Sequence, residues 1–158
     1  MRTLPTDEFG ARWPLAAPFV LVAALAVVAA GLVSAASAFA PSYEASWSVA
    51  YLTLVVGFSQ LVLGLGQAFL QVRPPDARTV RIEIGSYNLG NACVLAGSLL
   101  DLPVFTVVGA VLLAGTLYMF YNGTRGATTS GWPIILYRSV TAILALSIPV
   151  GLVIAAFG

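Results

Sequence analysis

Charged residues are so sparse in this chain that they leave uncharged stretches as long as a membrane-spanning helix. Only 8% of the 158 residues are charged and 59% are hydrophobic, whereas about a quarter of the residues of a soluble domain carry a charge. With so few charges the chain cannot cover a water-facing surface, so its main solvent must be lipid. We therefore expect an integral membrane protein in contact with the lipid bilayer.

Five uncharged stretches approach or exceed the roughly 20 residues that a helix needs to cross about 30 Å of hydrocarbon. They hold 31, 28, 17, 23 and 20 residues, and lie respectively after Arg12, Glu44, Glu83, Asp101 and Arg138. The sequence predicts an all-α bundle of five transmembrane helices over residues 15–40, 47–72, 84–100, 103–121 and 134–157. These helices form a single transmembrane domain over residues 1–158. The third is the shortest of the five, and the number of crossings depends on it.

The positions of the arginines predict the orientation of the bundle. All seven basic residues are Arg, and inner loops of membrane proteins are enriched in Arg and Lys. If the N-terminus is cytoplasmic, every Arg lies inside, and the two outer loops hold only Glu44 and Asp101. We therefore predict a cytoplasmic N-terminus and an external C-terminus.

A cleaved signal peptide is the alternative interpretation of the first helix. Ala38-Phe39-Ala40 resembles a small-x-small cleavage site. The apolar stretch before it, however, exceeds the usual 7–15 residues of a signal peptide, roughly twofold. We therefore favour an uncleaved first helix.

The composition excludes several kinds of chemistry. The chain has no His, no Lys and one Cys, and its net charge is +1. Histidine-ligated haem, ordinary zinc sites and Ser-His catalysis need His, and Schiff-base cofactors need Lys. No basic patch exists to neutralise the phosphates of a nucleic acid. We expect a protein that is not an enzyme, holds no metal or cofactor and binds no nucleic acid.

Amide side chains form a stripe on each of two neighbouring helices at membrane depth. Gln60 and Gln67 lie at helical spacing in the second helix, and Asn88 and Asn91 do so in the third. At a rise of about 1.5 Å per residue, Gln67 and the two Asn residues lie roughly 6–11 Å from the inner ends of their helices. The two stripes are thus expected to meet.

Two roles are open for these amides. Polar groups in membrane helices usually hydrogen-bond to a neighbouring helix, and small residues beside them allow close approach. We expect this packing role, with Gly57, Gly64 and Gly66 facing Gly85 and Gly90. The alternative is a path for a small neutral solute, lined by Gln60, Gln67, Asn88 and Asn91.

Charged and small residues indicate possible contact surfaces. Glu83 is expected to mark the inner membrane boundary beside Arg81, because no ionisable residue falls deep within a predicted span. Four arginines are expected to meet inner-leaflet lipid or a partner protein: Arg73, Arg78, Arg81 and Arg138. In the first helix, small residues spaced by four predict an edge for contacts within the bundle or with another protein: Ala26, Ala30, Ser34 and Ala38.

Short motifs between residues 50 and 155 carry a family resemblance. They are Gly57-Phe58, Gly64-Leu65-Gly66-Gln67, Tyr87-Asn88-Leu89-Gly90, Gly97, Tyr137-Arg138 and Pro149-Val150-Gly151. This pattern resembles small multi-span proteins related to the haem-copper oxidase subunit I and NnrS-type group. Those proteins bind haem or copper through histidines. Since this chain has none, the resemblance implies a scaffold without the metal site.

The sequence predicts a role carried out by contact rather than by chemistry. We expect a non-catalytic accessory or structural subunit, or a self-associating helix bundle, whose partners are other membrane protein subunits or copies of itself. The alternative is a small oligomeric channel or facilitator for a neutral or apolar solute. The bias toward Arg, Ala, Val and Gly is typical of GC-rich prokaryotes, so we expect a multi-pass protein of the prokaryotic cytoplasmic (inner) membrane.

Overall fold

The computed structural model describes residues 6–71, 73–125 and 131–157, and over these residues it contains helices and short connections without any strand. The helices are α1 (Thr6–Ala36), α2 (Tyr43–Ala50), η1 (Tyr51–Phe58), α3 (Ser59–Leu70), α4 (Ala77–Leu99), α5 (Pro103–Gly123) and α6 (Trp132–Phe157). No residue separates α2, η1 and α3, so the second predicted helix is one continuous segment with a π-helical middle. The all-helical prediction is confirmed for the described residues.

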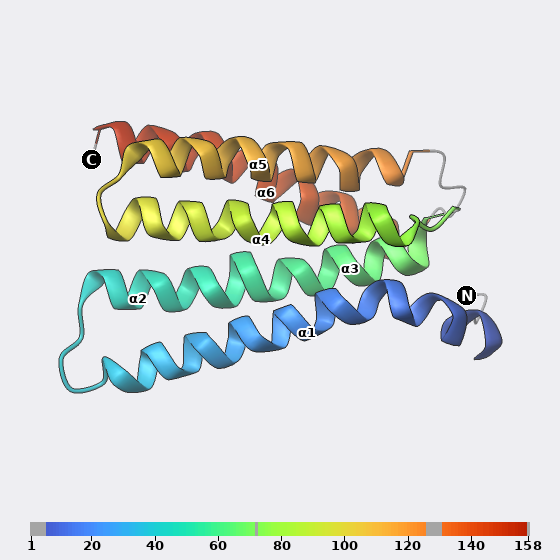
Figure 1. The fold of residues 1–158 in the computed structure, drawn as a ribbon, viewed down its shortest axis with the longest axis horizontal. Coiled ribbons are helices and arrows are strands. Elements are labelled where there is room, and N and C mark those ends of the chain that lie inside the picture. The colour runs from blue at the N-terminus through green and yellow to red at the C-terminus, as the bar shows by residue number, and fades with distance from the viewer. Residues whose placement is uncertain (1–5, 72, 126–130, 158) are drawn as a thin grey trace.

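The five helical segments run side by side with alternating direction (Figure 1). The α1–α2 and α4–α5 connections and the end of α6 lie at one end of the molecule. The start of α1 and the α3–α4 and α5–α6 connections lie at the other. We call the latter the arginine end, because the described arginines lie there: Arg12, Arg73, Arg78, Arg81, Arg125 and Arg138. The opposite end, which holds Glu44 and Asp101, is the carboxylate end.

Four segments within the described residues are long and apolar enough to cross a membrane. They are Gly10–Ala36, Tyr43–Leu70, Pro103–Gly123 and Trp132–Val153. The α4 helix is not among them, because amide, small and charged residues lower its hydropathy. A membrane protein with apolar helices facing lipid is therefore supported, and a crossing by α4 stays a prediction.

Local sequence signals explain where helices begin. The N-cap of α4 is Asp76, whose carboxylate accepts a hydrogen bond of 2.7 Å from the backbone N–H of Thr79. The same bond holds the pKa of Asp76 below its ordinary value. This cap starts α4 seven residues before the predicted start at 84, outside the apolar stretch. At the C-terminal end of α4, Asp101 adopts a positive φ of 54° in the short turn to α5, and Pro103 is the first residue of α5, where its missing N–H costs nothing.

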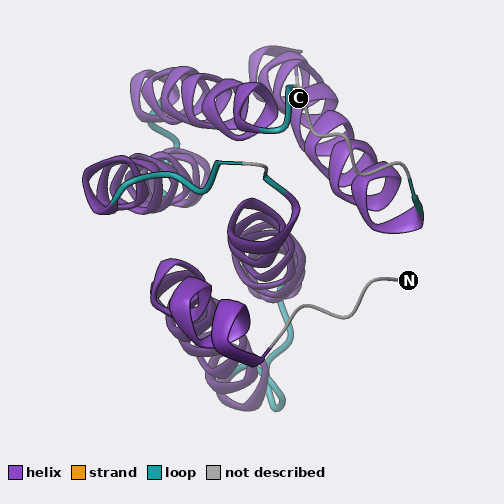
Figure 2. Cartoon of the chain, turned by 90° about the vertical axis from the view of Figure 1, so that its right-hand side faces the viewer, coloured by secondary structure: helices purple, strands orange, loops and turns teal. Residues whose placement is uncertain are grey.

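The helices form two groups, which are visible in the end view of Figure 2. α1 packs against the continuous α2–η1–α3 segment, and α4 packs against α5, which in turn contacts α6. Direct contact between the groups is mainly between α3 and α6. A buried cluster lies where the groups meet, and includes Phe19, Leu63, Tyr87, Phe120 and Tyr137.

Glycines allow close packing, but against other partners than expected. A Cβ at Gly64 would collide with Phe19 of α1, and one at Gly66 would collide with the ring of Tyr137 of α6. Gly90 lies against α5, where a Cβ would be 2.9 Å from Leu113. The expected facing of glycines between the second and third helices is therefore wrong: these glycines serve contacts to α1, α5 and α6, while Gly85 faces open space.

The predicted small-residue edge of α1 is divided between two environments. Ala26 and Ala30 are buried in the bundle, whereas Ser34 and Ala38 are exposed. Part of this edge therefore packs within the chain. Ala38 lies beyond the end of α1, because the helix stops at Ala36 rather than at the predicted residue 40.

Candidate functional site

Polar side chains bridge the two helix groups in the middle of α4, between Tyr87 and Asn91. At the centre, Gln60 of α3 and Asn88 of α4 form a reciprocal amide pair, with N···O distances of 3.0 and 2.9 Å. The second N–H of each amide donates to a carbonyl of its own helix, Val56 for Gln60 and Ile84 for Asn88. All four amide hydrogens are thus used. The predicted meeting of the two stripes occurs at this pair.

Three hydroxyl groups continue the bridge toward the carboxylate end. The Tyr51 hydroxyl donates to the Asn91 side-chain oxygen at 2.8 Å, and the Asn91 amide donates to the Tyr87 carbonyl at 2.8 Å. The Tyr87 hydroxyl lies 2.6 Å from the Ser59 hydroxyl and donates to the Val55 carbonyl. Asn91 therefore pairs with Tyr51, and not with an amide of the second helix.

The π-helical segment explains why Tyr51 reaches α4. In a regular α-helix of 3.6 residues per turn, Tyr51 and Gln60 are nine residues apart and would point in opposite directions, roughly 180° apart. A π-helix places more residues in each turn. Over Tyr51–Phe58 this difference accumulates and brings Tyr51 onto the same face as Ser59 and Gln60. Regular helical spacing therefore could not identify Tyr51 as part of the bridge.

Gln67 and Glu83 form a different kind of site near the arginine end. Gln67 has an exposed fraction of 0% and Glu83 of 2%. The Gln67 amide is near enough to the Glu83 carboxyl to interact with it. Yet neither polar atom of Gln67, nor the Oε2 atom of Glu83, has a partner of hydrogen-bond geometry among the described residues. Buried polar atoms without partners are rare and costly.

Glu83 and Arg81 lie in different surroundings. Arg81 is exposed, and its Nε donates at 3.1 Å to the Ala77 carbonyl of its own helix. Glu83 is on the opposite side of α4 and lies inside the bundle. That the two residues mark the inner membrane boundary stays a prediction, whereas the inward position of Glu83 was not expected. The early start of α4 is the reason, since it turns the segment before residue 84 into helix with an inward face.

Arginine side chains bind the ends of two helices at the arginine end. Arg12 Nη1 donates to the carbonyls of Ala68 and Gln71 at 3.3 Å each, and so caps the C-terminus of α3. Arg138 Nη2 donates to the Thr124 carbonyl at 3.0 Å, just beyond α5. Cations are favoured at helix C-termini, where carbonyls lack partners. The remaining predicted contact residues are exposed at this end: Arg73, Arg78 and Arg81.

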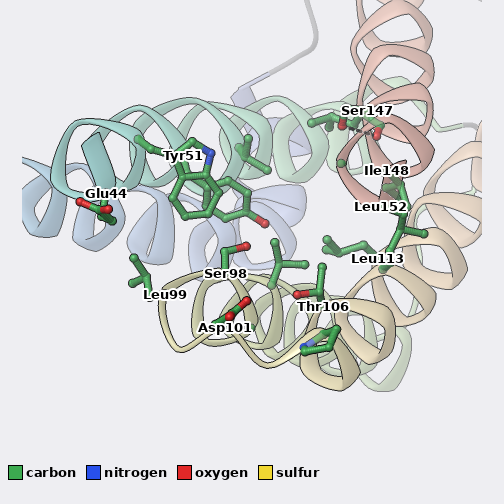
Figure 3. Close-up of a pocket in the computed structure, with 18 of the residues that line it drawn as sticks. Glu44, Tyr51, Ser98, Leu99, Asp101, Thr106, Leu113, Ser147, Ile148 and Leu152 are labelled. Atoms are coloured by element: carbon green, nitrogen blue, oxygen red, sulfur yellow. Dashed lines mark hydrogen bonds between the residues drawn. The ribbon is translucent and has the colours of Figure 1, made fainter. Parts of the chain in front are cut away.

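A cavity of about 520 Å³ opens at the carboxylate end between the two helix groups (Figure 3). Its walls come from α2 and η1 on one side and from α4, α5 and α6 on the other. Glu44 and Asp101 lie at the mouth, together with Tyr43 and Trp47. The hydroxyl of Tyr51 and the ring of Tyr87 connect the cavity to the polar bridge. Sequence reasoning missed this cavity, because its walls come from four separate segments.

These features define the class of the molecule as a helical membrane protein with a polar bridge between two helix groups and a cavity at its carboxylate end. No protein family model matches the chain, and neither the curated proteins nor the solved structures compared with it give a match. Its resemblance to the haem-copper oxidase subunit I and NnrS-type group therefore stays a prediction. Its function has to be argued from its own residues.

Proposed function

We propose that this is a non-catalytic protein of the prokaryotic cytoplasmic membrane that works by contact, as an accessory or structural subunit or as a self-associating bundle. The proposal includes five crossings, with α4 as the third, a cytoplasmic N-terminus and an external C-terminus. The segregation of all described arginines to one end supports this orientation.

The Gln60–Asn88 pair is the observation that carries the proposal. Because all amide hydrogens of this pair bond within the protein, the centre of the polar bridge has no free N–H donor for a passing solute. Its hydrogen bonds instead hold the two helix groups in register. A bundle fixed in this way presents long apolar faces, including Leu21, Leu25, Val28 and Leu32 on α1, to lipid or to another helix.

The test is the mass and composition of the complex extracted from its native membrane in mild detergent. A stoichiometric second protein supports the accessory role, and a homo-oligomer supports self-association. Asn91→Leu, which removes the bond to Tyr51, is expected to shift the complex toward smaller species. Ala92→Leu, on the exposed side of the same turn, is the control. A wild-type protein that is monomeric and alone would contradict the proposal.

A second candidate is a channel or facilitator for a neutral or apolar solute, as part of an oligomer. The unpartnered amide of Gln67 favours it, because this buried donor and acceptor are free to bind a polar solute or water. Liposomes with the purified protein would then pass a small neutral solute such as glycerol. Gln67→Leu would reduce that flux, and a flux equal to that of empty liposomes would exclude this role.

A further inference from the structure

The cavity at the carboxylate end extends far along the helices between the two helix groups, and we call it the shaft. Along α5 it extends from Pro103 to Leu117, which corresponds to roughly 21 Å of helix. Residues on the other walls reach similar depths, namely Val55 in η1, Tyr87 in α4 and Leu144 in α6. A volume of about 520 Å³ spread over this depth is enough for one extended alkyl chain.

The shaft changes character from its mouth to its base. Its inner walls are mostly aliphatic, with Ala110, Leu113, Leu117 and Ile148 among them, and Tyr51, Tyr87 and Ser147 add hydroxyl groups. Its mouth carries the Glu44 and Asp101 carboxylates, and none of the described arginines lines it. Figure 3 shows both carboxylates at the same end of the cavity, with the aliphatic side chains farther along α5 and α6.

The mouth favours positive charge for two reasons. Among the helices that line the cavity, α2 and α5 have their N-termini at this end and α4 and α6 have their C-termini there, so their partial charges of about half an elementary charge offset one another. The two carboxylates therefore set the sign of the local potential. Tyr43 and Trp47 add aromatic rings beside Glu44, and aromatic rings attract ammonium groups.

We propose that this shaft binds a single-chain amphiphile with a cationic headgroup, the chain in the aliphatic interior and the headgroup between Glu44 and Asp101. Such a ligand enters at the carboxylate end. Its chain is shielded from water by the walls, and its charge stays at the hydrated mouth. This binding role goes beyond the contact function proposed above and does not depend on a membrane partner.

Two ligands of equal chain length and opposite charge test the proposal. Decyltrimethylammonium and decyl sulfate are titrated against the protein in nanodiscs of zwitterionic lipid, with protein-free nanodiscs as the blank. We expect saturable binding of the cation and at least about tenfold weaker binding of the anion, since each carboxylate contributes roughly fivefold through the Coulomb interaction in water. Glu44→Gln with Asp101→Asn should remove most of this difference.

Two glycines offer a matched pair for the chain-binding part of the shaft. Gly151 lines the cavity and Gly115 of α5 does not, and an added Cβ at either meets nothing within 4 Å. Gly151→Leu therefore fills the shaft without a clash and should lower the affinity for the cation at least about tenfold. Gly115→Leu should leave the affinity unchanged.

Three outcomes would overturn the proposal. Equal affinity for the two charges would indicate an apolar site without headgroup selection, such as one for a lipid chain. Equal effects of Gly151→Leu and Gly115→Leu would place binding outside the shaft. Binding of neither ligand above the blank would leave the cavity to another occupant, such as a partner helix.

Discussion

At the scale of single residues, the central question for each buried polar group is whether it has a partner. Gln60 and Asn88 satisfy each other and their own helices completely. Gln67 and Glu83 are fully buried, and both polar atoms of Gln67 and the Oε2 atom of Glu83 lack hydrogen-bond partners among the described residues. The Gln60–Asn88 pair stabilises the bundle. Gln67 and Glu83 lower its stability unless Glu83 is protonated or a water or solute molecule occupies the site.

The reciprocal pair predicts a specific double-mutant pattern. Gln60→Leu leaves the partly buried Asn88 amide with only one of its hydrogen bonds, so the free energy of unfolding should fall by about 1–2 kcal/mol. Adding Asn88→Leu removes the orphaned group and should restore most of the loss. Thermal unfolding in detergent measures both. Additive losses in the double variant would show that the two amides do not act as a pair.

The buried carboxylate predicts an unusual stabilising substitution. Glu83→Gln keeps the shape but removes an ionisable group from the interior, and buried charge without a partner is costly. We expect the unfolding temperature to rise by a few degrees, because about 1 kcal/mol corresponds to roughly 2–4 °C in a chain of this size. The exposed Glu44, changed to Gln, should have little effect. A lower unfolding temperature for Glu83→Gln would instead indicate a bound cation at this carboxylate.

At the scale of helices, glycines decide how closely neighbouring elements approach. Gly64 allows α3 to rest on Phe19 of α1, and Gly66 allows it to rest on Tyr137 of α6. α3 is therefore held on two sides by glycine contacts and on a third by the amide pair with α4.

Alanine substitutions at two glycines should separate packing from helix propensity. Gly64→Ala places a new Cβ too close to the Cβ and Cγ atoms of Phe19, which are near the Phe19 backbone and cannot easily move. The substitution should therefore lower the free energy of unfolding by about 1–3 kcal/mol. Gly85→Ala meets open space and should be neutral, or stabilising by up to about 1 kcal/mol. Chemical or thermal unfolding compares the two. Similar values for both would mean that α1 and α3 are less tightly packed than described.

At the scale of the whole molecule, the separation of charge between the two ends predicts the orientation in the membrane. Single cysteines are introduced at Ser42, Leu102 and Arg78 in a Cys93→Ala background, and treated with a membrane-impermeant thiol reagent. Positions 42 and 102 should be labelled in intact cells, and position 78 only after permeabilisation. Labelling of position 102 only after permeabilisation would show that α4 does not cross.

The amino-acid sequence by itself determined the class and most of the helices. Long uncharged stretches specify membrane helices because an unpaired charge or backbone group in lipid costs too much. The meeting of Gln60 with Asn88 follows from helical spacing and occurs as expected. The turn before Pro103 follows from the local preference of proline for the start of a helix.

Only the tertiary structure decided the rest, because it depends on how separate segments pack. The π-helical segment brings Tyr51 onto the face of Gln60, which no fixed helical period predicts. The start of α4 at Ala77 turns Glu83 inward, although its sequence neighbours are typical of a membrane boundary. The shaft lies between the two helix groups, whose direct contact is mainly between α3 and α6, and this arrangement arises only when both groups are folded.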